Sequence, residues 1–188
     1  YPGFSTDVGP GNTMMDAYMQ KHLGYACDEN GVLAASGTIV QKLLKELMDH
    51  PFFDGGFPKT IGPELFNLDY LEKAIARVGG SYSHADIMAT LNRFSAEGIL
   101  LALQKSVPPN QPWVVYGSGG GVHNPVLMEH LQMAFPSIAF RHTGELGVPV
   151  DAKEAVLFAL LANECVAGES LGKALFKDGM PDISMGKI

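Results

Sequence analysis

The chain has 188 residues, of which 46% are hydrophobic and 18% are charged, and its net charge is −7 at pH 7. This composition is typical of a globular protein that buries a core, and the acidic balance excludes an electropositive nucleic-acid surface. The sequence shows no membrane-spanning stretch and no signal-peptide pattern, so we expect a cytoplasmic protein with neither a membrane nor a nucleic-acid partner. The two cysteines, Cys27 and Cys165, form no C-x-x-C motif, and we predict that both are buried thiols.

The first feature along the chain is a glycine turn at residues 7–12 (DVGPGN), which leads into a helix. Asn12 is a typical N-cap residue, and Gly24 is expected to end the helix. Free backbone N–H groups at a helix start can hold a phosphate group or a sugar hydroxyl. We therefore predict that Gly9, Gly11 and Asn12 contribute to a nucleotide site.

Three helices are predicted in the next part of the chain. The apolar stripe of residues 40–48 predicts the first, Asn67 caps the second, and Ser83 opens the third. Residues 51–66 contain four phenylalanines and no periodicity, which indicates an ordered surface loop. The first of these helices is predicted to serve packing, whereas an ordered loop of this kind often lines a cleft, with Lys59 and Thr60 as its polar candidates.

Residues 112–135 (PWVVYGSGGGVHNPVLMEHLQMAF) form the unit around which the rest of the chain is organised. The continuous apolar run from Trp113 to Tyr116 predicts a short buried strand. A turn follows in which several residues lack a Cβ atom, so a flat ligand can approach the backbone. The glycines that we assign to nucleotide binding are Gly119, Gly120 and Gly121.

Asn124 is predicted to cap the helix after this turn, with Pro125 at its first helical position. A strand, a glycine turn and a helix start bind ligands in many α/β proteins, and in others they only connect packed elements. The stretch matches neither the phosphate-binding P-loop nor the G-x-G-x-x-G dinucleotide pattern. We include Asn124 among the candidate nucleotide-binding residues.

The last predicted elements are a strand at residues 137–140, a loop at 143–150 and a helix that Asp151 caps. This helix is apolar nearly all round, so we expect it to be buried between layers. Glu154 either completes a capping box with Asp151 or presents a carboxylate to sugar hydroxyls in a cleft. The sequence contains no convincing metal-ligand spacing and no nucleophile motif, so we predict neither catalytic nor metal-ligating residues in this chain.

Five motifs, in register over nearly the whole chain, resemble the C-terminal half of the anhydro-N-acetylmuramic acid kinase family. They are DVGPGN-x-MMDA (7–17), PKTIGPELF (58–66), DIMATL (86–91), GGGVHNPVLM (119–128) and LGVPVDAKEAVLFALLAN (146–163). The resemblance implies an α/β fold, the helix-rich C-terminal domain of an actin-like ATPase (sugar kinase) with a partial mixed sheet. Residues 1–188 would then be the nucleotide-binding domain of a two-domain kinase whose N-terminal domain is absent from this chain.

The resemblance also implies an activity. Such kinases open the 1,6-anhydro ring of anhydro-N-acetylmuramic acid hydrolytically and phosphorylate O6 with ATP and Mg²⁺, during recycling of cell-wall peptidoglycan. The turn from Gly119 to Asn124 would correspond to the family's adenosine motif, and the turn from Gly9 to Asn12 would lie near the cleft floor. Glu154 would correspond to the sugar-contacting carboxylate. Homodimers are usual in the family, so a homodimer is a possible assembly.

The family's phosphate loop (G-T-S-x-D-G), its catalytic Asp and its N-I-G-G turn all precede the DxGPGN motif and have no counterpart here. Because phosphoryl transfer depends on positioning by both walls of the cleft, we predict that this chain alone is inactive and has an exposed sheet edge. Two alternatives stay open: a kinase for another anhydro-sugar such as levoglucosan, and a non-catalytic nucleotide-binding module.

Overall fold

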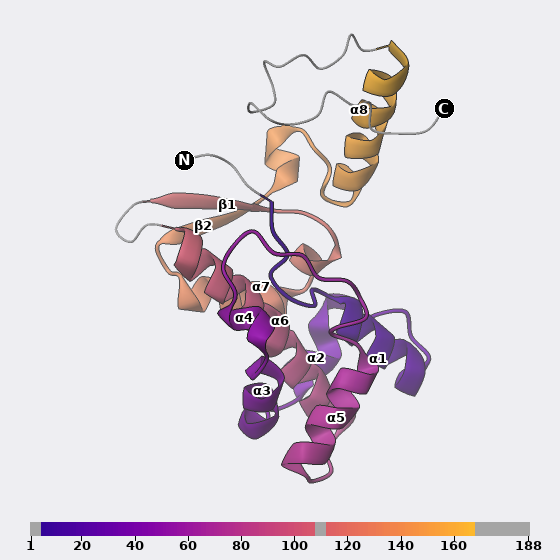
Figure 1. The fold of residues 1–188 in the computed structure, drawn as a ribbon, viewed down its shortest axis with the longest axis vertical. Helices are drawn as coiled ribbons and strands as arrows, with labels where there is room; N and C mark the ends of the chain where they lie inside the picture. Colours follow the sequence, from indigo (N-terminus) through magenta and orange to yellow (C-terminus); the bar gives the residue numbers. More distant parts are fainter. Residues whose placement is uncertain (1–4, 108–111, 168–188) are drawn as a thin grey trace.

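The computed structural model describes residues 5–107 and 112–167. Figure 1 shows a body of helices, a small sheet at one end of this body, and a final helix beyond the sheet. The helices and strands in chain order are α1 (Thr13–Leu23), η1 (Glu29–Gly31), α2 (Val32–Ser36), α3 (Gln41–Met48), α4 (Pro51–Asp54), α5 (Leu68–Val78), α6 (His84–Ser106), β1 (Trp113–Gly117), η2 (Gly120–His123), α7 (Pro125–Ala134), β2 (Ile138–His142), η3 (Thr143–Leu146), η4 (Val150–Ala152) and α8 (Lys153–Ala167).

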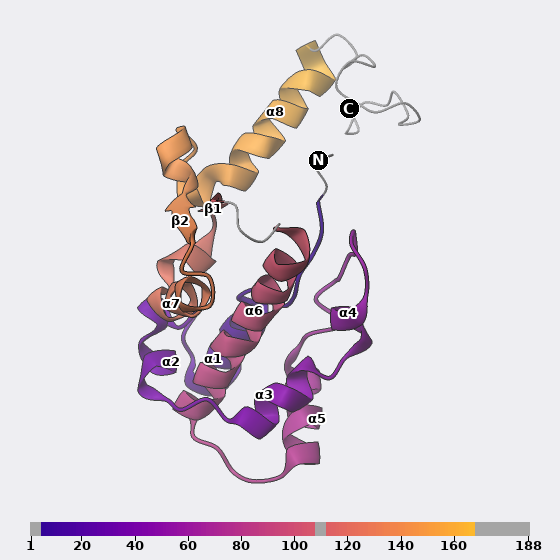
Figure 2. The same ribbon diagram turned by 90° about the vertical axis from the view of Figure 1, so that its left-hand side faces the viewer.

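The long helix α6 is the centre of the body. It packs against α2 and α7 on one side and against α3 on the other (Figure 2). Phe94 of α6 is completely buried, and the rings of Phe53, Phe66 and Tyr70 surround it with centroid distances of 5.7, 5.4 and 6.5 Å. Aromatic pairs of this kind bury large apolar areas, so this cluster anchors the segments that the sequence left without periodicity.

Local capping chemistry sets the helix boundaries, as predicted. Asn67 Oδ1 accepts a hydrogen bond from Tyr70 N at 3.0 Å, and Ser83 Oγ accepts one from Asp86 N at 3.1 Å. Gly24 ends α1 in the left-handed conformation, with φ of 75°. The segment predicted as one loop from residue 51 to 66 instead begins with the short helix α4.

The two strands are parallel, with Trp113 opposite Ile138 and Gly117 opposite His142. The prediction of a mixed sheet was wrong for the described part of the chain, because α7 crosses from the end of β1 back to the start of β2. β1 is also less buried than predicted: 43% of Val114 and 38% of Tyr116 are exposed, so one face of the sheet is uncovered. Each strand has one pairing partner among the described residues, as expected for an open sheet.

Helix α8 is exposed, which contradicts the prediction that it is buried between layers. It packs mainly against η4 and projects away from the body (Figures 1 and 2). Its exposed large apolar side chains are Val156, Leu157, Phe158, Leu160 and Val166. Apolar side chains of this kind are normally buried against another surface, and the described part of the chain covers few of them. Across residues 5–107 and 112–167, no helix combines the length and apolarity needed to cross a membrane.

Candidate functional site

The two glycine turns of the sequence lie side by side in the structure. A Cβ atom on Gly120 would lie 3.4 Å from Asn12 Nδ2, and one on Gly121 would lie 3.6 Å from Asn12 Oδ1. Asn12 occupies the N-cap position of α1, but its side chain makes no capping hydrogen bond, contrary to the prediction. The Asn12 amide is directed to the second turn instead. It lies next to the positions that side chains on Gly120 and Gly121 would occupy.

A pocket of about 400 Å³ opens where the turns meet. Its lining comes from the start of α1, from η1 with the two residues before it, and from the η2 turn with the start of α7. The lining residues are Asn12, Met15, Asp16, Cys27, Asp28, Glu29, Asn30, Gly120, His123 and Asn124. Three of the seven nucleotide-binding candidates therefore line one cavity, and its volume lies within the range of ligand pockets, roughly 300–1,000 Å³.

The first turn is fixed against α6 by glycines on both the turn and the helix. A Cβ atom on Gly98 would lie 2.6 Å from Val8 O and 3.5 Å from Gly9 Cα, so the turn and the helix approach closely. Gly11 has φ of 57°, and its carbonyl accepts a hydrogen bond from Ser95 Oγ at 2.6 Å. Gly9 and Gly11 do not line the pocket, and the contacts give them a role in holding the turn in place.

Asn124 is buried and caps α7 as predicted, because its Oδ1 accepts from Leu127 N at 3.2 Å. A Cβ atom on Gly31 would lie only 2.5 Å from this oxygen, and Gly31 has φ of 66°. A residue with a side chain at position 31 would therefore collide with the cap. This close approach holds η1, whose Glu29 and Asn30 line the pocket, against the N-cap of α7.

Sequence reasoning missed the wall formed by residues 27–30. Asp28 caps α2 with both carboxylate oxygens, which accept from Leu33 N at 2.8 Å and from Ala34 N at 2.9 Å. Asn30 has φ of 56°, a conformation that Asn tolerates better than most residues. An Asp followed three residues later by a Gly was the signal available, because both residue types favour turns.

Cys27 is exposed, so the prediction that it is buried was wrong. The side chain of Cys165 lies outside the described part.

His123, at the rim of the pocket, connects the η2 turn to the segment before α8. Its Nε2 lies 3.0 Å from Asp151 Oδ1, and Gly119 N donates to Val150 O at 2.9 Å. Asp151 belongs to η4 and pairs with His123. The described hydrogen bonds include none from the Asp151 N–H to the Glu154 carboxylate, so the structure does not form the capping box, which was one of the two alternatives for Glu154.

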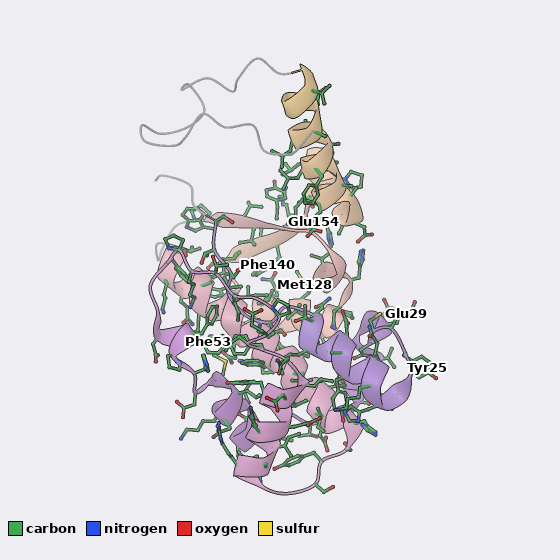
Figure 3. All side chains as sticks on the ribbon, turned by 45° about the vertical axis from the view of Figure 1, so that its right-hand side comes forward. Tyr25, Glu29, Phe53, Met128, Phe140 and Glu154 are labelled. Atoms are coloured by element: carbon green, nitrogen blue, oxygen red, sulfur yellow. The ribbon has the colours of Figure 1, made fainter. Side chains whose placement is uncertain are left out.

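Glu154 lies apart from the pocket. Figure 3 shows it at the base of α8, whereas Glu29 of the pocket wall lies beside α1. Glu154 is exposed and is not among the residues that line the pocket. Within residues 5–107 and 112–167, no group of three or more His, Cys, Asp or Glu side chains is arranged to hold a metal ion.

Comparison with known proteins identifies the family. The sequence profile described as anhydro-N-acetylmuramic acid kinase matches residues 2–172. The chain belongs to the anhydro-N-acetylmuramic acid kinase family. Family membership implies an actin-like ATPase fold, in agreement with the helix-rich body and its small parallel sheet.

Several proteins named anhydro-N-acetylmuramic acid kinase are similar to this member of the family. The protein from Pseudoalteromonas translucida is 50% identical over 98% of this chain, and that from Pseudoalteromonas atlantica is 47% identical over 98%. The protein from Cupriavidus pinatubonensis is 37% identical over 85% of the chain. The matches cover 47%, 47% and 42% of those relatives, so the chain spans about half the length of the kinases it resembles.

Proposed function

We propose that this chain is the nucleotide-binding half of an ATP-dependent kinase that opens and 6-phosphorylates 1,6-anhydro-N-acetylmuramic acid in peptidoglycan recycling. The observation that carries the proposal is the meeting of both glycine turns at one pocket of about 400 Å³ in a chain of this family. The fold provides the pocket walls through local contacts, and a nucleoside is a ligand of suitable size for it.

The proposal gives a role to Glu154 and to the three nucleotide-binding candidates that line the pocket. Gly120, which lines the pocket beside the Asn12 amide, would offer its backbone to the base, while Asn12 and Asn124 hold the two turns in position. Glu154, on a different element, would contact the sugar. This half would supply a nucleotide wall and one sugar contact, and the other half would complete the positioning that phosphoryl transfer requires. Because the described residues offer no metal donor set, we assign no step to Mg²⁺ in this chain.

The proposed partner of this chain is the N-terminal kinase domain. Exposed apolar side chains on α8 and on one face of β1 need cover, and α8 also carries Glu154. A second domain on this surface would cover the apolar side chains and place Glu154 at the cleft between the two halves. We therefore assign α8 to the contact between domains.

Calorimetric titration with ADP tests the nucleotide site. Gly120→Val adds a branched side chain to the pocket wall, next to Asn12 Nδ2, without requiring a left-handed backbone, and we expect ADP affinity to fall by at least about tenfold. Gly144→Val is the matched control: Gly144 also lies in a 3₁₀ helix, outside the pocket, and its added Cβ would meet no atom within 4 Å. Equal ADP affinity in both variants would contradict the assignment of the pocket.

A further inference from the structure

The pocket contains a carboxylate that the fold itself does not use. Asp16 lies in the first turn of α1 and lines the pocket. It follows Asn12 by one helical turn, with Asp16 N donating to Asn12 O at 2.9 Å, so both side chains lie on the same face of the helix. Asp16 is therefore next to any ligand that rests on Gly120.

Asp16 differs from the other two carboxylates of the pocket. Both oxygens of Asp28 accept backbone N–H groups of α2, and Glu29 is exposed to solvent. Among residues 5–107 and 112–167, none forms a hydrogen bond or an ion pair with the Asp16 carboxylate. Burial raises its pKa, so the structure partly desolvates this group without compensation. Both of its acceptor oxygens are available to a ligand.

The chemistry of the pocket defines the part of a nucleotide that fits beside Asp16. An ionised carboxylate only accepts hydrogen bonds, so the ligand must present donors. A phosphate group would face like charges from Asp16, Asp28 and Glu29, and such an arrangement is unfavourable. The uncharged nucleoside part is compatible, and the adjacent 2′ and 3′ hydroxyls of ribose are two donors matched to two carboxylate oxygens.

We propose that Asp16 binds the ribose hydroxyls of the nucleotide and makes the pocket selective for ribonucleotides over deoxyribonucleotides. This inference rests on the proposed nucleotide site and adds the residue that determines its specificity. The ribose then faces α1, the base covers Gly120, and the phosphates leave the pocket on the side away from the acidic wall.

The test is a cycle of binding measurements with ADP, 2′-deoxy-ADP and 3′-deoxy-ADP on the wild-type chain and on Asp16→Ala. In the wild type we expect loss of either hydroxyl to weaken binding by about tenfold, because each hydrogen bond to a charged group is lost. In Asp16→Ala the same losses should have almost no further effect. Asp69→Ala is the control: Asp69 also lies in the first turn of an 11-residue helix, and its carboxylate pairs with Lys73 outside the pocket.

The outcomes separate this inference from the proposed function. If ADP binds but the deoxy penalties are equal in the wild type and in Asp16→Ala, the assignment of Asp16 is wrong and the nucleotide site stands. Weakened binding of inosine diphosphate, with no deoxy penalty, would also overturn it, because Asp16 would then accept from the 6-amine of adenine. A folded chain that binds no ADP overturns both proposals. Asp16→Asn, which retains the shape of the side chain, replaces the alanine variant if that variant does not fold.

Discussion

Asp16 should be unfavourable for the stability of the folded chain. Its pKa lies above the ordinary value of 3.8 because burial removes water from the charged form, and no described residue compensates for that loss. Binding sites often contain groups of this kind, since an unpaired side chain is available to a ligand. A single substitution of Asp16 should therefore make the folded chain more stable and at the same time weaken its binding of a ligand.

We predict that Asp16→Asn increases the free energy of unfolding at neutral pH while it weakens ADP binding. The folded state disfavours the ionised carboxylate, so the destabilisation is present above the raised pKa and disappears as the pH falls below 3.8. Urea denaturation of both proteins at neutral pH and at about pH 3.5 would measure this difference. A variant that is less stable than the wild type at neutral pH would show that Asp16 has a stabilising partner.

At the scale of single residues, the sequence predicted where the glycine turns lie, but it did not predict which glycines pack against a helix and which line the pocket. Gly9 and Gly120 look equivalent in the sequence, since each belongs to a glycine turn before a helix. The structure packs Gly9 against Gly98 of α6 and exposes Gly120 to the pocket. Glycine permits close approach in both cases, and the approaching group comes from a distant segment that local patterns do not specify.

At the scale of secondary-structure elements, α7 packs against α6 and holds one wall of the pocket in place. Asn124 caps its first turn, and Leu127 and Leu131 pack with Ala96 and Leu100. His130, on the same helix, has Nδ1 at 3.4 Å from Arg93 Nη1. Burial lowers the pKa of His130, and the positive charge of Arg93 lowers it further.

We predict that the contact between α6 and α7 is sensitive to acid. The folded pKa of His130 lies below 6.5, so its stabilising contribution is present above that pH and is lost as the pH falls. Melting temperatures between about pH 7 and about pH 5 should therefore fall more steeply for the wild type than for His130→Gln. His142→Gln, at an exposed position at the end of β2, is the control. Parallel curves for the wild type and His130→Gln would refute this prediction.

Caps and long periodic stripes allowed the prediction of α5, α6 and α7, because those signals are local. The η1 and α2 segments were missed, since each is too short to show a period and is held by Asp28 and by contacts with α6 and α7. The burial of α8 was predicted wrongly because an apolar composition indicates a need for cover and does not reveal which surface provides it. The two strands are parallel because α7 runs from the end of β1 back to the start of β2.

At the scale of the whole molecule, seven of the eleven exposed large apolar side chains of the described residues lie on β1 and α8, at one end of the structure. Helix α8 projects from the body, as Figure 2 shows, and the uncovered face of β1 lies near its base. An apolar surface of this kind on a protein marks a contact with a partner. The chain spans about half of the length of these relatives, and the half of them that has no counterpart here is the partner that we propose.

We predict that this chain alone does not phosphorylate an anhydro-sugar, and that it does so together with the part of the Pseudoalteromonas translucida relative that has no counterpart here. Phe158→Glu should abolish this restored activity, since Phe158 is 67% exposed on α8 and would meet the partner. ADP affinity and the stability of the isolated chain should change little, by less than about 0.5 kcal/mol.

Met133→Glu is the matched control, because Met133 is 72% exposed on α7, away from α8. Gel filtration would follow assembly, and a kinase assay with 1,6-anhydro-N-acetylmuramic acid and with levoglucosan would follow activity and the choice of sugar. Activity of the isolated chain would contradict the assignment of catalysis to both halves. Loss of assembly in Met133→Glu, with Phe158→Glu unaffected, would place the contact on the helical body and leave α8 without its proposed role.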